Sequence, residues 1–162
     1  MAGMLAITLQ SCSYIRNLSE GVTDPVTPDE SKAQVIDAAR EIVTTLSLKG
    51  VTAYFSHDSC NDQGEAPFRG RVRIAYDHAP TLEASKAEVH QMVATLKQHG
   101  WDVPGDFHTH GSAVSRHGTT AVFDFYSPVQ ESGPSIFIYG ECRDMTTKHN
   151  SRVEEIPGDE LA

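Results

Sequence analysis

Apolar residues recur at helical spacing in two segments of the chain. In the first, Thr27, Pro28 and Glu30 supply a capping side chain, a first-turn proline and the acid of a capping box. The apolar stripe that follows consists of Val35, Ile36, Ala39, Ile42, Val43 and Leu46. This spacing predicts a helix over 28–49, closed by a lysine and a glycine. A similar stripe and a closing glycine predict a second helix within 80–100.

Alternation of apolar and polar residues predicts strands elsewhere, and it is clearest over 68–76. One face of this predicted strand carries Phe68, Val72, Ile74 and Tyr76. The opposite face carries Arg69, Arg71 and Arg73. The other predicted strands are 51–57, 106–114, 119–126 and 135–141.

The predicted order is therefore α-β-β-α-β-β-β, without an internal repeat. Consecutive strands joined by short connections favour an antiparallel sheet. We expect an α+β fold in which two helices pack on one face of a five-stranded sheet, over residues 28–145. The other face is then open to solvent or to a partner. Residues 146–162 are expected to form a polar tail.

Composition and charge narrow the possible functions. The 162 residues carry 13 Lys and Arg against 22 Asp and Glu, a formal net charge of −9. Such a chain is a poor candidate for binding nucleic acid, because that requires a basic surface to displace counterions from phosphate. The sequence contains no nucleotide-binding loop or other cofactor motif, so no cofactor is expected.

The N-terminal segment ends in a cysteine. Residues 1–11 are uncharged and mostly apolar, and Leu9 and Ser11 precede Cys12 at the positions typical of a lipoprotein signal peptide. The segment resembles the end of such a signal, although the positive charges that usually open one are absent. The resemblance implies a lipid on Cys12 and a flexible spacer over 12–27. The alternative is a cytosolic protein whose N-terminus is not a signal.

The cysteine count fits the same interpretation. The chain has three cysteines, and if Cys12 carries a lipid, Cys60 and Cys142 remain as a pair. Each lies at or near the end of a predicted strand, so we expect a disulfide between them. In the cytosolic alternative both would be free thiols, because disulfides persist only in oxidising compartments.

The layout also resembles small envelope lipoproteins of mycobacteria and other actinobacteria, of the LppA-like type. The features that carry the resemblance are an N-terminal cysteine followed by a spacer, the order of elements and the tripeptide Gly140-Glu141-Cys142. The resemblance implies a protein anchored to the outer face of the cytoplasmic membrane and held by one internal disulfide. We expect a non-enzymatic binding or interaction module, whose biochemical role the resemblance leaves undefined.

Two histidines suggest a different function. His108 and His110 lie two residues apart, so on a strand their imidazoles point to one face, a spacing found in metal sites. With Asp106, Asp124 or His117 as a third ligand, they would make the chain a small metal-dependent hydrolase. The simpler interpretation is a pair of edge-strand histidines without a metal.

The three arginines of the strand over 68–76 are the other candidate site. Arg69, Arg71 and Arg73 lie roughly 7 Å apart along one face and form a basic stripe in an acidic protein. They are candidates for binding an anionic envelope ligand or a protein partner. The alternative is a solvated strand face whose arginines pair with neighbouring acids.

Overall fold

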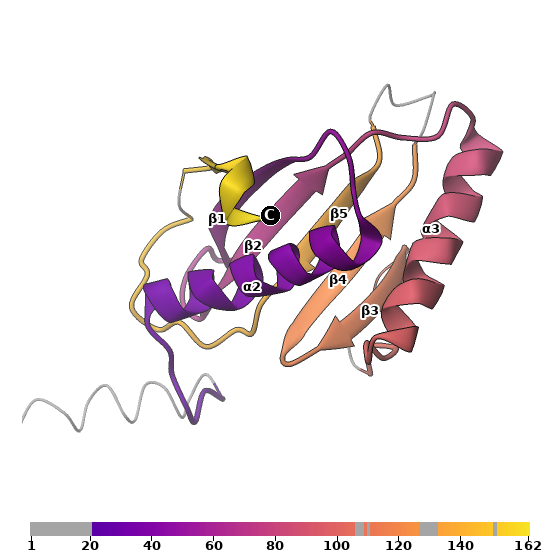
Figure 1. Cartoon of the computed structure of the whole chain (residues 1–162). Helices are drawn as coiled ribbons and strands as arrows, with labels where there is room; N and C mark the ends of the chain where they lie inside the picture. Colours follow the sequence, from indigo (N-terminus) through magenta and orange to yellow (C-terminus); the bar gives the residue numbers. More distant parts are fainter. Residues whose placement is uncertain (1–20, 106–108, 110, 127–132, 151) are drawn as a thin grey trace, which may run out of the picture.

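The computed structural model describes residues 21–105, 109, 111–126, 133–150 and 152–162 (Figure 1). The described residues form two helices and six strands in an α+β fold, which confirms the predicted fold class. In chain order the elements are α2 (Pro28–Leu46), β1 (Thr52–Ser59), β2 (Phe68–Ala75), α3 (Leu82–Gln98), β3 (Ser112–Arg116), β4 (Thr119–Asp124), β5 (Ser135–Tyr139), β6 (Glu154–Ile156) and the 3-10 turn η1 (Gly158–Glu160).

The strands form one open sheet in the order β3-β4-β5-β2-β1-β6, and all neighbouring pairs are antiparallel. The predicted count of five strands is wrong, because the segment 146–162 supplies a sixth. In β6, Ile156 pairs with Ala53 of β1 and is 5% exposed, and Leu161 beyond it is 1% exposed. Two separate apolar residues, rather than an alternating run, attach this segment to the domain.

Helix α2 begins as the sequence predicts. The Thr27 hydroxyl accepts a hydrogen bond from the Glu30 amide (3.2 Å), and the Glu30 carboxylate accepts one from the Thr27 amide (2.8 Å). The helix ends at Leu46, three residues before the predicted end. Ser47 turns left-handed (φ 52°) and donates its amide to the carbonyls at the end of the helix, which stops it before the lysine and glycine.

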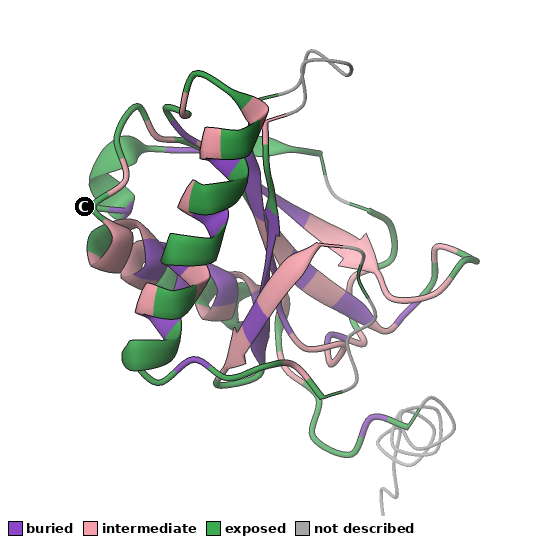
Figure 2. Cartoon of the chain, turned by 90° about the vertical axis from the view of Figure 1, so that its right-hand side faces the viewer, coloured by how far each residue is buried: buried purple, intermediate pink, exposed green. Residues whose placement is uncertain are grey.

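Both helices lie on one side of the sheet, and their buried stretches turn toward it (Figure 2). The core between the layers contains Val35 and Ile42 of α2, Leu96 of α3, and Ile74 and Ile138 of the sheet, each fully buried.

Helix α2 crosses β2 at very close range. The Gly70 amide donates a hydrogen bond to the Ser31 hydroxyl (2.8 Å), and a Cβ on Gly70 would lie 2.5 Å from the Ser31 carbonyl oxygen. Only glycine allows this approach. The predicted alternation in β2 is confirmed: its apolar side chains are buried beneath the helices, and its three arginines face the other side.

Candidate functional site

Cys60 and Cys142 form a disulfide, as the sequence predicts. Cys60 follows β1 and Cys142 follows β5, and β2 lies between these two strands in the sheet. Their Cα atoms are 6.0 Å apart and 82 positions apart in the sequence. The bond therefore joins the ends of two strands across the start of a third. A bond of this kind is typical of proteins that fold in an oxidising compartment.

The residues just before α2 lie against this disulfide-bonded end of the domain. Val22 is 5% exposed, and the Val26 amide donates to the Arg143 carbonyl (3.1 Å). The Arg143 side chain makes two contacts with Asp24. It forms an ion pair with the Asp24 carboxylate (2.5 Å) and donates a hydrogen bond to the Asp24 backbone carbonyl (2.6 Å). The last part of the segment expected as a spacer is thus attached to the domain next to Cys142. We call these residues, 22–26, the tether junction.

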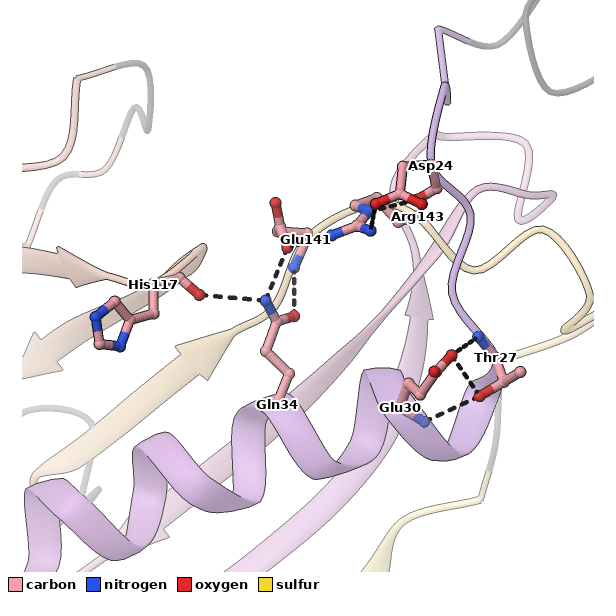
Figure 3. A network of polar contacts seen from close by, with 7 residues as sticks. All are labelled: Asp24, Thr27, Glu30, Gln34, His117, Glu141 and Arg143. Atoms are coloured by element: carbon pink, nitrogen blue, oxygen red, sulfur yellow. Dashed lines mark hydrogen bonds and ion pairs between the residues drawn. The ribbon is translucent and has the colours of Figure 1, made fainter.

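Figure 3 shows how the tether junction connects to the rest of the fold. The Glu141 carboxylate accepts hydrogen bonds from Arg143 and from Gln34 of α2, each 2.9 Å long. The Gln34 side chain also accepts a hydrogen bond from the Glu141 backbone amide (3.1 Å) and donates one to the carbonyl of His117 in the β3–β4 turn (3.4 Å). Helix, hairpin and disulfide segment are therefore joined through one glutamine.

Asp144 fixes the chain just after the disulfide. It is fully buried, and its carboxylate accepts hydrogen bonds from the amides of Thr146 (2.8 Å) and Thr147 (3.1 Å) and from both hydroxyls. Burial opposes the ionisation of Asp144, but these hydrogen bonds outweigh it and lower the pKa of the carboxyl. The charged form of Asp144 therefore stabilises the folded state.

The structure describes only two of the residues named in the metal-site hypothesis, Asp124 and His117. Asp106, His108 and His110 lie outside the described residues. Asp124 ends β4, and His117 occupies the β3–β4 turn with its side chain exposed and φ at 49°. Among the residues that the structure describes, no three His, Cys, Asp or Glu side chains form a group that could hold a metal ion.

The side of the sheet opposite the helices is the face that carries the three arginines, and we call it the open face. Antiparallel register places side chains in rows across it. One row runs Tyr54, Arg73, Phe137, Val122 from β1 to β4, and the next runs Ser56, Arg71, Tyr139, Thr120. Each of these two arginines therefore has an aromatic neighbour on β5.

Two of the arginines are held by partners on the open face. Arg71 forms an ion pair with Asp58 of β1 (2.9 Å). The Asp58 carboxylate also accepts a hydrogen bond from the Ser56 hydroxyl (2.8 Å). The guanidinium carbon of Arg69 lies 4.6 Å from the centroid of the Tyr139 ring. Burial lowers the pKa of Arg69 and raises the pKa of Tyr139, because each charged form loses water.

Arg73 has a different environment. Its side chain is exposed, its Nε donates to the Ser135 hydroxyl (3.2 Å), and its guanidinium lies 5.8 Å from the centroid of the Phe137 ring. Arg73 takes part in none of the ion pairs that join described residues. A carboxylate thus balances the charge of Arg71 but forms no ion pair with Arg73 among the described residues.

A hollow of about 380 Å³ lies beside Arg73, and we call it the arginine hollow. It is lined by Tyr54, Ser56, Arg71, Arg73 and Val153. The sequence identified the arginines as candidates but not the other residues that line the hollow. Tyr54 could have been found, because pairing the two predicted strands places it on the face that carries the arginines. Val153, just before β6, lies in no sequence pattern that would place it there.

In the part of the chain that the structure describes, neither helix has the length and apolar character needed to cross a bilayer.

Comparison with known proteins supplies the family. A family model described as "Putative lipoprotein LppJ" matches residues 27–158. Proteins with this description from two strains of Mycobacterium tuberculosis and from Mycobacterium bovis are each 35% identical over 130 residues. The match covers 78% of this chain and 66% of the relatives, so the chain spans just under two thirds of their length.

No solved structure matches the chain. The sequence resemblance pointed to mycobacterial lipoproteins of the LppA-like type, and the family that matches is LppJ, whose name likewise describes a lipoprotein of mycobacteria. The chain belongs to the family described as "Putative lipoprotein LppJ".

Proposed function

We propose that the chain is a non-enzymatic binding module of the cell envelope, anchored to the outer face of the cytoplasmic membrane by a lipid on Cys12. The observation that carries this proposal is the assignment of the three cysteines. Cys60 and Cys142 are bonded to each other, which leaves Cys12, at the end of a lipoprotein-type signal, as the remaining cysteine. Both features are expected of a chain exported to an oxidising compartment.

The tether junction supports an anchored domain. Val22, where the described chain is already buried against the domain, lies ten positions after Cys12. At most about 3.6 Å per residue, this length lets the domain stand no more than roughly 36 Å from the lipid-bearing residue. The Asp24–Arg143 contacts fix where the tether leaves the domain and hence limit how the domain can turn relative to the membrane.

The open face supports a binding role. It carries three arginines interleaved with aromatic side chains, and two of them, Arg71 and Arg73, line the arginine hollow. Arginine is suited to anions because its planar fork can donate two parallel hydrogen bonds to a carboxylate or phosphate. The module is therefore expected to hold an anionic envelope ligand on the face that the helices leave uncovered.

Lipid attachment is tested by expressing the full chain in a mycobacterial host supplied with an alkyne-labelled fatty acid. The wild-type chain should carry the label and enter the detergent phase on partition, and Cys12→Ser should do neither. Ser13→Ala is the matched control, because it changes the neighbouring residue and keeps the thiol. Equal labelling and partition of wild type and Cys12→Ser would refute the proposed anchor.

A further inference from the structure

The arginine hollow holds two cations with different counterions. Arg71 and Arg73 lie on the same face of β2, two residues and hence roughly 7 Å apart. Asp58 balances the charge of Arg71, whereas none of the described carboxylates forms an ion pair with Arg73. An oxyanion entering the hollow therefore meets a net positive charge that is centred on Arg73.

The guanidinium of Arg73 is held in place without being neutralised. Its Nε donates to Ser135 on the neighbouring strand, and the ring of Phe137 lies beneath it. In the described structure, no hydrogen bond from its two terminal nitrogens is formed. These nitrogens can donate to a ligand at little further cost in side-chain entropy, because the side chain is already ordered.

The walls of the hollow favour a ligand with a ring. Tyr54 is 36% exposed and lies next to Arg73 in the same cross-strand row, and Val153, which also lines the hollow, is 62% exposed. An aromatic side chain beside a cation offers a flat apolar surface for the C–H face of a sugar ring while the cation holds an acidic substituent. A volume of about 380 Å³ lies at the small end of ligand sites, which suits one or two such rings.

The charge of the whole open face decides between a small anion and a membrane surface. Three acids, Asp58, Asp124 and Glu155, lie on the same side of the sheet as the three arginines. The face as a whole is therefore close to neutral, and the chain carries a net charge of −9. An anionic bilayer would experience this summed charge, whereas a single carboxylate or phosphate interacts mainly with the nearest guanidiniums.

We propose that the arginine hollow binds an acidic sugar, with its carboxylate or phosphate on Arg73 and Arg71 and its ring against Tyr54. The site rests on the binding role proposed above and gives that role a ligand class. A carboxylate and a phosphate present the same oxyanion chemistry to the guanidiniums, so the test includes a sugar of each kind.

The experiment is a titration of the purified full chain in nonionic detergent at low salt, followed by calorimetry and by backbone amide chemical shifts. The probes are glucuronate, glucose 6-phosphate and, as the neutral control, glucose. We expect glucuronate or glucose 6-phosphate to bind and to shift amides of β1 and β2, and glucose to bind at least tenfold more weakly. Raising the salt concentration should weaken the binding.

Variants then test the two contacts. Arg73→Gln should reduce the affinity about tenfold or more, since it removes a charged hydrogen-bond donor. Lys97→Gln, which removes the same charge from an exposed position on α3, should leave the affinity unchanged. Tyr54→Ala should weaken binding, whereas Tyr54→Phe, which keeps the ring, should not. Amide spectra of each variant show whether it is folded.

Three results would overturn the proposed site. The first is that neither sugar anion binds at millimolar concentration, and the second is that glucose binds as well as glucuronate. The third is Arg73-dependent pelleting with phosphatidylglycerol vesicles in the absence of sugar binding, which would assign the face to a membrane surface. None of these results depends on Cys12, so they are distinguishable from failure of the proposed lipid anchor.

Discussion

Removing the Cys60–Cys142 disulfide should destabilise the domain strongly. The bond closes a loop of 82 positions, and the chain-entropy relation for a loop of this length gives about 4.5 kcal/mol at 25 °C. A domain of this size has a free energy of unfolding of roughly 5–15 kcal/mol. The double variant Cys60→Ala/Cys142→Ala should therefore lose a large fraction of its stability.

The assay is urea unfolding of the full chain followed by the fluorescence of Trp101, its one tryptophan. With a typical dependence of the unfolding free energy on urea, the expected loss lowers the midpoint by roughly 2 M. Cys12→Ala is the matched control and should leave the midpoint unchanged, because Cys12 is not part of the disulfide. If the double variant fails to fold, the oxidised and reduced wild-type chains provide the same comparison.

A loss of less than about 1 kcal/mol would refute this reasoning. It would mean that the hydrogen bonds between β1, β2 and β5 hold the domain without the cross-link. The unfolded chain would then gain little freedom from reduction, contrary to the loop-closure estimate.

Three further substitutions test other parts of the structure. Gly70→Ala should cost about 2 kcal/mol in thermal or urea unfolding, because its Cβ would meet the Ser31 carbonyl oxygen at 2.5 Å, and a neutral result would contradict the close helix–strand approach. The lowered pKa of Asp144 gives stability that is present in full above the ordinary value of 3.8 and is lost as the pH falls through the lower folded-state pKa; Asp144→Asn should remove this part of the pH dependence of unfolding, and an unchanged profile would disprove it. Glu41→Ala should cost about 1 kcal/mol and shift the fluorescence emission of Trp101, because it removes the carboxylate that accepts the Trp101 indole N–H (3.1 Å) and pairs with Arg116, whereas identical spectra and stability would exclude these contacts in solution.

Elements with complete local signals could be predicted from the sequence. The capping box of Thr27 and Glu30 and the alternation along β2 each lie within a few residues, so local physics is enough to place them. Strand β6 could not be predicted in this way. It has two glutamates and a single buried apolar residue, Ile156, and it forms because the edge of β1 offers hydrogen bonds to a segment about 100 positions away.

The candidate site was predictable only in part, for the same reason. The arginine row follows from the alternation of β2, but the side chains beside it depend on the strand order β5-β2-β1. That order places Phe137 on one side of Arg73 and Tyr54 on the other. The partner of Arg71 likewise comes from β1, where Asp58 showed no pattern that would assign it to an arginine.

The most direct test of an exported, lipid-anchored protein is the intact mass of the full chain extracted from the membrane fraction of a mycobacterial host, measured before and after reduction. We expect a chain that begins at Cys12, carries the added mass of a diacylglyceryl group and gains two hydrogens on reduction. A chain without added lipid mass, recovered from the soluble fraction with three free thiols, would contradict it.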